Sequence, residues 1–132
     1  MNNARRIFKV LSVLIIMLTL AVTICGLCSF NTTQTYHVTN QYGEDVLMWG
    51  SGIYRHDSFF KVPIFIGSDF SVLVFVVPFA ILTFWKTFQK ESVEYLIRSF
   101  SVMSLLLYYA ASLAFGVTYN LMHLVYIALF SM

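Results

Sequence analysis

The side chains best suited to acid–base or ligand chemistry stand together in residues 50–61, GSGIYRHDSFFK. Tyr54, Arg55, His56 and Asp57 occupy four consecutive positions of a chain that is only 11% charged. Adjacent residues on an extended chain point to opposite faces, so these side chains cannot all converge on one atom. Arg55 and Asp57 could share a face and form an ion pair, which would leave His56 on the opposite face. Three roles stay open for the cluster: a structural role, recognition of a ligand or ion, and catalysis with partners from elsewhere.

Neither a metal site nor a catalytic site has the spacing that its chemistry needs. His37, His56 and Asp57 are conceivable metal ligands, but no two histidines have the H-x-x-x-H spacing of a helical metal site. An acid–base site would have to recruit further acidic residues from residues 31–69. We therefore predict no catalytic residue, no metal and no cofactor.

Cys25 and Cys28, in CGLC, have the C-x-x-C spacing of thiol oxidoreductases. They lie at the C-terminal end of a predicted helix, where the helix dipole disfavours a thiolate. The sequence contains no second cysteine pair to relay electrons. A role as small packing residues is the favoured interpretation, and a membrane thiol oxidoreductase is an alternative hypothesis.

A line of polar side chains runs through the otherwise apolar residues 99–132. Its members are Tyr108, Ser112, Tyr119, Asn120, His123 and Tyr126. A polar stripe facing lipid is costly, so we expect this side to pack against other helices or to line a cavity. Asn120 and His123 are candidate ligand or ion residues, although interhelical hydrogen bonding would explain them equally well. Only one histidine lies in a predicted span, which argues against a haem held by two histidines.

The composition indicates a membrane protein. The chain is 59% hydrophobic and 11% charged, whereas soluble domains are typically about 25% charged. The apolar residues form long runs rather than the spacing of an amphipathic surface helix. We predict an all-α membrane protein with three to four transmembrane helices. Its expected partners are the lipid bilayer and other transmembrane helices, including a second copy of itself, but not nucleic acid.

The apolar runs place the predicted spans. Residues 10–30 carry no charge and as a helix would cover roughly 30 Å, so a retained anchor is favoured over a cleaved signal peptide. Residues 70–85 form the second span, with a kink expected at Pro78. Residues 99–132 are too long for one crossing, and the sequence FGVTYN favours a turn. We therefore expect a third span at residues 99–117 and the start of a fourth at residues 120–132, in a chain that is a fragment of a longer protein or is completed by a partner.

Asp69 stands at the predicted start of the second span, within GSD. There Ser68 would cap the first free amides, and the negative charge of Asp69 would lie at the positive end of the helix dipole. A carboxylate deeper in the membrane would instead mark an ion pathway. We expect a cap at the rim of the membrane and keep the ion pathway as the alternative.

The basic residues give a predicted orientation in the cell membrane. Six of the eight Lys and Arg side chains precede the first span or lie between the second and third, and the other two are Arg55 and Lys61. Because cytoplasmic loops are enriched in basic residues, residues 1–9 and 86–98 are predicted to be cytoplasmic and residues 31–69 extracytoplasmic.

Each predicted loop has an expected structure of its own. In residues 86–98, charged side chains that include Glu91 oppose an apolar face, which indicates an amphipathic helix on the inner membrane surface. In residues 35–49, alternating side chains around the turn signal YGED predict a β-hairpin. The many aromatic rings of residues 31–69 indicate that this segment lies against the membrane face or the helix ends.

The stretches NQYGEDV and GSGIYRHDSFFKVPIFIGSD resemble segments of multi-pass bacterial integral membrane proteins of unassigned function. The resemblance implies further helices after residue 132 and no particular chemistry. The polar line within the predicted spans, in a chain without a catalytic constellation, favours a non-enzymatic transporter- or channel-like component, or a fragment of one. The alternative is a cell-envelope interaction protein whose loop of residues 31–69 binds a partner.

Overall fold

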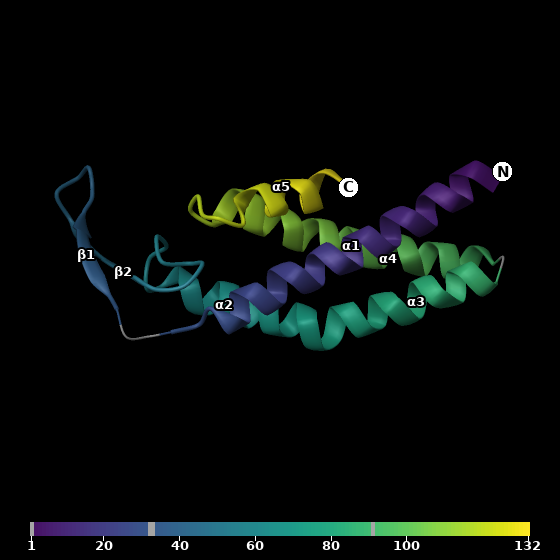
Figure 1. Cartoon of the computed structure of the whole chain (residues 1–132), viewed down its shortest axis with the longest axis horizontal. Coiled ribbons are helices and arrows are strands. Elements are labelled where there is room, and N and C mark those ends of the chain that lie inside the picture. Colours follow the sequence, from purple (N-terminus) through teal and green to yellow (C-terminus); the bar gives the residue numbers. More distant parts are fainter. Residues whose placement is uncertain (1, 32–33, 91) are drawn as a thin grey trace.

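Three long helical segments lie along one another in the computed structural model, which describes residues 2–31, 34–90 and 92–132 (Figure 1). The segments are α1 (Asn2–Cys28), the continuous run of α2 (Lys61–Ser71), η1 (Val72–Val76) and α3 (Val77–Gln89), and α4 (Val93–Gly116). Each is long and apolar enough to cross a membrane. The prediction of a helical protein with three such segments is therefore confirmed at this level.

The second long segment begins at Lys61, so the predicted boundary at Phe70 was wrong. Residues 61–69, KVPIFIGSD, extend the helix because most of them are apolar and Pro63 falls in the first turn, where the missing N–H is not needed. Ser68 lies inside this helix and donates to the Ile64 carbonyl at 2.9 Å rather than capping a helix start. Asp69 is consequently an interior residue of α2 and not a cap.

The expected irregularity at Pro78 takes the form of a π-helical turn immediately before it. In η1, the Val77 amide donates to the Val72 carbonyl, five residues back. A proline offers no amide to the preceding turn, and a widened turn is one way in which a helix accommodates that loss.

The predicted amphipathic helix of residues 86–98 does not exist as a separate element. α3 continues to Gln89 and α4 already begins at Val93, so this stretch consists of two helix ends and the turn between them. Lys90 and Ser92 have extended backbone angles, which end one helix and precede the next. Glu91 lies outside the described residues.

The break predicted within FGVTYN is confirmed. α4 ends at Gly116, Val117 is extended, and the short helix α5 (His123–Ser131) follows. The Asn120 side-chain oxygen accepts the Met122 amide at 2.8 Å and fixes the turn that starts α5. At nine residues, α5 is about 14 Å long, roughly half of a hydrocarbon layer. It packs against α4 and α1.

The predicted hairpin is confirmed as β1 (Tyr36–Thr39) paired antiparallel with β2 (Asp45–Met48). At its turn, the Asn40 side-chain oxygen accepts the amides of Tyr42 and Glu44, each at 2.9 Å. The hairpin projects beyond the helices at one end of the molecule, called here the hairpin end (Figure 1). It is followed by residues 49–60, called here the hairpin-end loop, which bury Trp49, Tyr54 and Asp57.

The opposite end of the molecule holds the N-terminus and the turn between α3 and α4 (Figure 1). Two basic groups that are far apart in sequence therefore come to the same end. They are Arg5, Arg6 and Lys9, and Lys86, Lys90 and Arg98.

Gly50 and Gly43 form a matched pair for testing how the hairpin is held, because their φ angles are 81° and 82°. A Cβ atom on Gly50 would overlap the Gln34 carbonyl oxygen, whereas one on Gly43 would meet nothing within 4 Å. We predict that Gly43→Ala lowers the free energy of unfolding by about 1 kcal/mol, the cost of the backbone angle, and that Gly50→Ala lowers it by roughly 3 kcal/mol. Thermal unfolding in detergent in a Trp85→Phe background, followed by the fluorescence of Trp49, measures both. Equal effects would contradict the close approach at Gly50.

Candidate functional site

Asp69 is the most enclosed charged residue of the helical segments. Its side chain is 0% exposed, and its two oxygens accept from different hydroxyl groups. Oδ2 accepts from Tyr54 at 2.6 Å, and Oδ1 accepts from Tyr109 at 2.5 Å. The ion pairs found among the described residues, His37 with Asp45 and Glu94 with Arg98, do not involve it. The carboxylate is therefore held by neutral donors.

The two tyrosines come from segments that are distant in sequence. Tyr54 belongs to the hairpin-end loop, 15 residues before Asp69, and Tyr109 belongs to α4, 40 residues after it. Burial, and secondarily the nearby Asp69 carboxylate, raise the pKa of the Tyr54 phenol far above its ordinary value. Tyr54 therefore stays protonated and remains a hydrogen-bond donor. This carboxylate connects the loop, α2 and α4.

Helix α1 closes the site with a glycine. A Cβ atom on Gly26 would overlap Asp69 Oδ2 and would lie 3.2 Å from the Tyr54 hydroxyl oxygen. Any larger residue at this position would displace the carboxylate or the helix. Gly26 is therefore part of the site because of the side chain that it lacks.

Tyr126 extends the polar cluster into α5. It is 1% exposed and adjoins both Tyr54 and Asn120. The His123 ring centroid lies 5.1 Å from that of Tyr119 and 6.2 Å from that of Tyr126. The predicted polar line thus divides: Asn120, His123 and Tyr126 face the interior, whereas Tyr108 and Tyr119 are exposed.

The predicted ion pair between Arg55 and Asp57 is wrong. Arg55 Nε donates to His56 Nε2 at 2.9 Å, and His56 Nδ1 lies 3.4 Å from the Tyr36 hydroxyl of the hairpin. Asp57 turns inward, and its Oδ1 accepts both the amide and the hydroxyl of Thr118, at 3.0 and 2.9 Å. The rule of alternating faces fails here because the segment is a turn, in which the Asp57 amide donates to the Tyr54 carbonyl at 2.9 Å.

The two cysteines are free thiols on the last turn of α1, with Cys25 half-buried and Cys28 exposed. Within residues 2–31, 34–90 and 92–132, no group of three His, Cys, Asp or Glu side chains is placed to hold a metal ion. Thiol redox chemistry at this pair, and partner binding by the hairpin and its loop, stay predictions.

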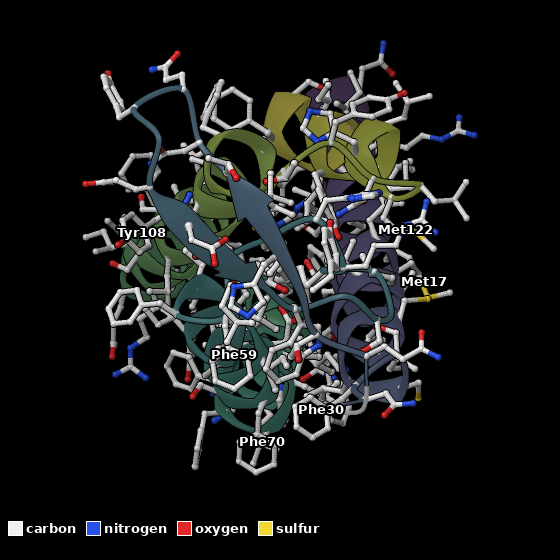
Figure 2. The ribbon with its side chains drawn as sticks, turned by 90° about the vertical axis from the view of Figure 1, so that its left-hand side faces the viewer. Met17, Phe30, Phe59, Phe70, Tyr108 and Met122 are labelled. Atoms are coloured by element: carbon white, nitrogen blue, oxygen red, sulfur yellow. The ribbon has the colours of Figure 1, made fainter. Side chains whose placement is uncertain are left out.

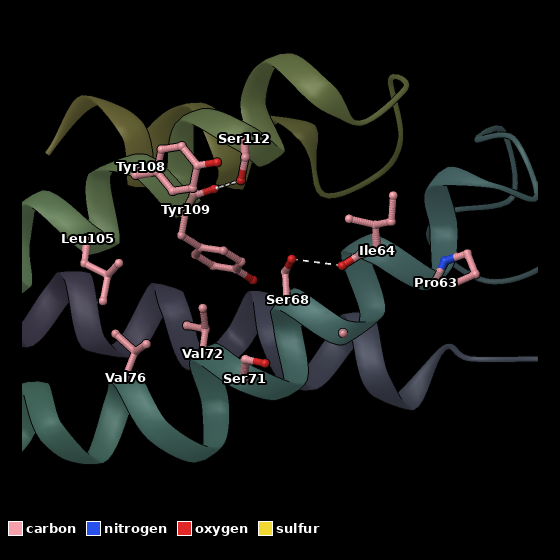
Figure 3. A pocket seen from close by; sticks show the side chains of 11 residues that line it. Pro63, Ile64, Ser68, Ser71, Val72, Val76, Leu105, Tyr108, Tyr109 and Ser112 are labelled. Carbon is pink, nitrogen blue, oxygen red and sulfur yellow. Dashed lines mark hydrogen bonds between the residues drawn. The ribbon is translucent and has the colours of Figure 1, made fainter.

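A groove of about 500 Å³ runs between α2–η1 and α4 beside the Asp69 site (Figure 3). Its lining combines apolar side chains with hydroxyl groups: Pro63, Ile64, Gly67, Ser68, Ser71, Val72, Val76, Leu105, Tyr108, Tyr109 and Ser112. The Tyr109 ring points from α4 toward α2 in this view, and its hydroxyl is the one that bonds to Asp69. A single aromatic ring therefore connects the groove with the buried carboxylate.

Tyr109 and Gly26 are the members of this site that sequence reasoning missed. Tyr109 is 4% exposed and lies on one face of α4 with Val102, Leu106 and Leu113, which are also buried. That helical periodicity was a usable signal, since it places Tyr109 on the inner face and its neighbour Tyr108 on the outer face. No comparable signal distinguishes Gly26, because the need for a glycine at this position arises from Asp69, a residue on another helix.

Comparison of this chain with protein-family models, curated proteins and solved structures finds no match.

Gly26 and Gly67 are a matched pair for testing the packing around Asp69, since both lie inside helices. A Cβ atom on Gly67 would meet nothing within 4 Å. We predict that Gly26→Ala lowers the free energy of unfolding by roughly 1–3 kcal/mol through overpacking, whereas Gly67→Ala leaves it unchanged or raises it by up to about 1 kcal/mol. Unfolding in mixed micelles with increasing SDS, followed by circular dichroism, measures both. If Gly26→Ala were as stable as the unchanged protein, the contact with Asp69 would be refuted.

Proposed function

We propose that this chain is an integral membrane protein whose three long helical segments span the bilayer, and that it is a non-enzymatic transporter- or channel-like component centred on Asp69. Such a component acts alone or as part of a larger assembly.

The exposure of the apolar helix surfaces supports membrane insertion. Only 22–33% of the most apolar window of each segment is buried inside the protein. Large side chains such as Met17, Phe70 and Tyr108 point outward from the helices, as Figure 2 shows. In water, so much exposed apolar surface would be unfavourable, whereas lipid tails solvate it.

The observation that carries the transport proposal is the burial of Asp69 within an apolar helix. Asp69 is eight positions after Lys61, so it lies about 12 Å along the segment from the start of α2. Ionisable side chains at such depth are rare and generally belong to ion or substrate pathways. An anionic centre held by neutral hydroxyl donors favours a proton or a monovalent cation as the transported species.

The groove offers a route for movement at this site. It opens beside Tyr109, which both lines it and donates to Asp69. Rotation of this one side chain would open the carboxylate to the groove. We therefore assign Tyr109 the role of a gate and Tyr54 that of a second donor that keeps the carboxylate positioned.

Flux through reconstituted vesicles tests the proposal. We predict that the protein carries protons or Na⁺ above the level of empty vesicles, under a K⁺/valinomycin potential and with pH- or Na⁺-sensitive dyes inside. Asp69→Asn preserves the size of the side chain and one of its two acceptor oxygens but removes the charge, and it should lower the flux at least about tenfold, the factor that corresponds to roughly 1.4 kcal/mol in binding. Asp45→Asn, at an exposed acidic residue of the hairpin, is the matched control and should leave the flux unchanged. Flux equal to that of empty vesicles, or unaffected by Asp69→Asn, would refute the transport role.

We further propose that the end holding the N-terminus and the α3–α4 turn is cytoplasmic, in a plasma membrane. The gathering of six basic residues at that end supports this orientation.

Labelling of single cysteines tests the orientation. In a chain with Cys25→Ser and Cys28→Ser, a membrane-impermeant maleimide should label Tyr42→Cys, at the hairpin turn, in intact cells. It should label Lys90→Cys, at the α3–α4 turn, only after the membrane is permeabilised. Tyr42 is 80% exposed, so failure to react is not explained by burial. The reverse pattern would invert the proposed topology.

A further inference from the structure

Three buried polar atoms lack a hydrogen-bond partner among the residues that the structure describes, and all belong to the hairpin end. They are Asp57 Oδ2, Asn120 Nδ2 and His123 Nδ1. The segments that carry them are in direct contact, because Thr118 donates twice to Asp57. Buried polar atoms are normally satisfied by protein, water or an ion, so the buried Asp57 Oδ2, a carboxylate oxygen without a partner, indicates a bound polar species at this atom.

Asp57 is the charged member of this group and is fixed in place. Its side chain is 1% exposed. Its amide donates to the Tyr54 carbonyl and its carbonyl accepts the Trp49 amide, each at 2.9 Å, so the residue cannot simply turn to solvent. The adjacent cation, Arg55, is directed to His56 instead. Oδ1 therefore has two donors from Thr118, and Oδ2 has none.

The chemistry of a carboxylate oxygen restricts what can occupy this position. An ionised carboxylate only accepts hydrogen bonds, and its burial is unfavourable by several kcal/mol unless a positive charge or donors compensate it. Hard cations prefer oxygen ligands, whereas zinc-type sites need sets of His and Cys that the described ranges do not bring together. A single carboxylate matches a single positive charge, since Ca²⁺ sites commonly combine several carboxylates.

We propose that Asp57 binds a small alkali-metal cation through Oδ2, at a site separate from Asp69. Thr118 is exposed, so the site lies one residue layer beneath the surface of the hairpin end. The cation would stabilise the contact between the hairpin-end loop and residues 117–122. This proposal is independent of the transport proposal, because a cation can bind at Asp57 whether or not any species crosses the membrane at Asp69.

Trp49 provides a reporter of occupancy. Its amide is bonded to Asp57, its side chain is 3% exposed, and its ring lies against Phe30 and Phe59. In a Trp85→Phe background it is the sole tryptophan. The purified protein in detergent is titrated with NaCl, KCl or LiCl at constant ionic strength, with choline chloride as the balancing salt. We expect a saturable change in Trp49 fluorescence with at least one of the three alkali cations and none with choline.

Substitutions then assign the site. Asp57→Asn keeps the acceptor for Thr118 and should raise the apparent Kd for the cation at least about tenfold. Asp45→Asn should leave the Kd unchanged. Absence of a saturable response to all three cations, an equal response to choline, or a response that survives Asp57→Asn would overturn the proposal.

A second measurement uses the intact carboxylate, in case Asp57→Asn fails to fold. The melting temperature of the Trp85→Phe protein should rise with the cation relative to choline, because a ligand that binds only the folded state stabilises it. No rise would also overturn the proposal. Both measurements are made in detergent without a membrane gradient, so a negative flux result in vesicles leaves them unaffected.

Discussion

A carboxylate cannot remain without partners in an apolar interior, and this constraint organises the helices around Asp69. Its two oxygens need donors, and tyrosine hydroxyls from the hairpin-end loop and from α4 supply them. The third neighbour, α1, approaches closely only because Gly26 has no side chain. One polar contact therefore fixes the relative positions of three helices and a loop, in a molecule where nonspecific apolar packing would allow many arrangements.

The two ends of the molecule have different chemistry. The end with the α3–α4 turn gathers basic side chains, which suits attraction to an anionic surface. The hairpin end buries two carboxylates, Asp57 and Asp69, of which one is satisfied by two phenols and the other only in part. Tyr54 contributes to both, since its hydroxyl bonds to Asp69 and its carbonyl accepts the Asp57 amide. Tyr54 therefore links the two buried carboxylates directly.

Local patterns in the sequence were sufficient for the elements but not for the site. The charge-free runs predict most of α1 and most of α4, although α1 begins at Asn2 and not at Val10. The residues around Gly116 predict the break before α5, and YGED predicts the hairpin turn. The amphipathic pattern of residues 86–98 led to the wrong prediction of a separate helix, because two adjacent helix ends can give the same pattern on a helical wheel as one short helix. Asp69 was identified but placed at a helix start, since a Gly-Ser-Asp sequence usually ends or opens an element. Its true environment depends on Tyr109, 40 residues away, and on Gly26. The periodicity of α4 places Tyr109 on an inner face but does not pair it with Asp69, and Gly26 has no local signature.

The strength of the coupling between Asp69 and Tyr109 is the most direct measure of the central claim. Unfolding in mixed micelles gives the decrease in the free energy of unfolding caused by Tyr109→Phe. This decrease is measured in the unchanged protein and in an Asp69→Leu background, and the two values are compared. If the carboxylate holds the helices through this hydroxyl, Tyr109→Phe should lower the free energy of unfolding by about 1.5–3 kcal/mol in the first case and by close to zero in the second. The same cost in both backgrounds, within about 0.5 kcal/mol, would mean that Tyr109 and Asp69 act independently and would contradict the account.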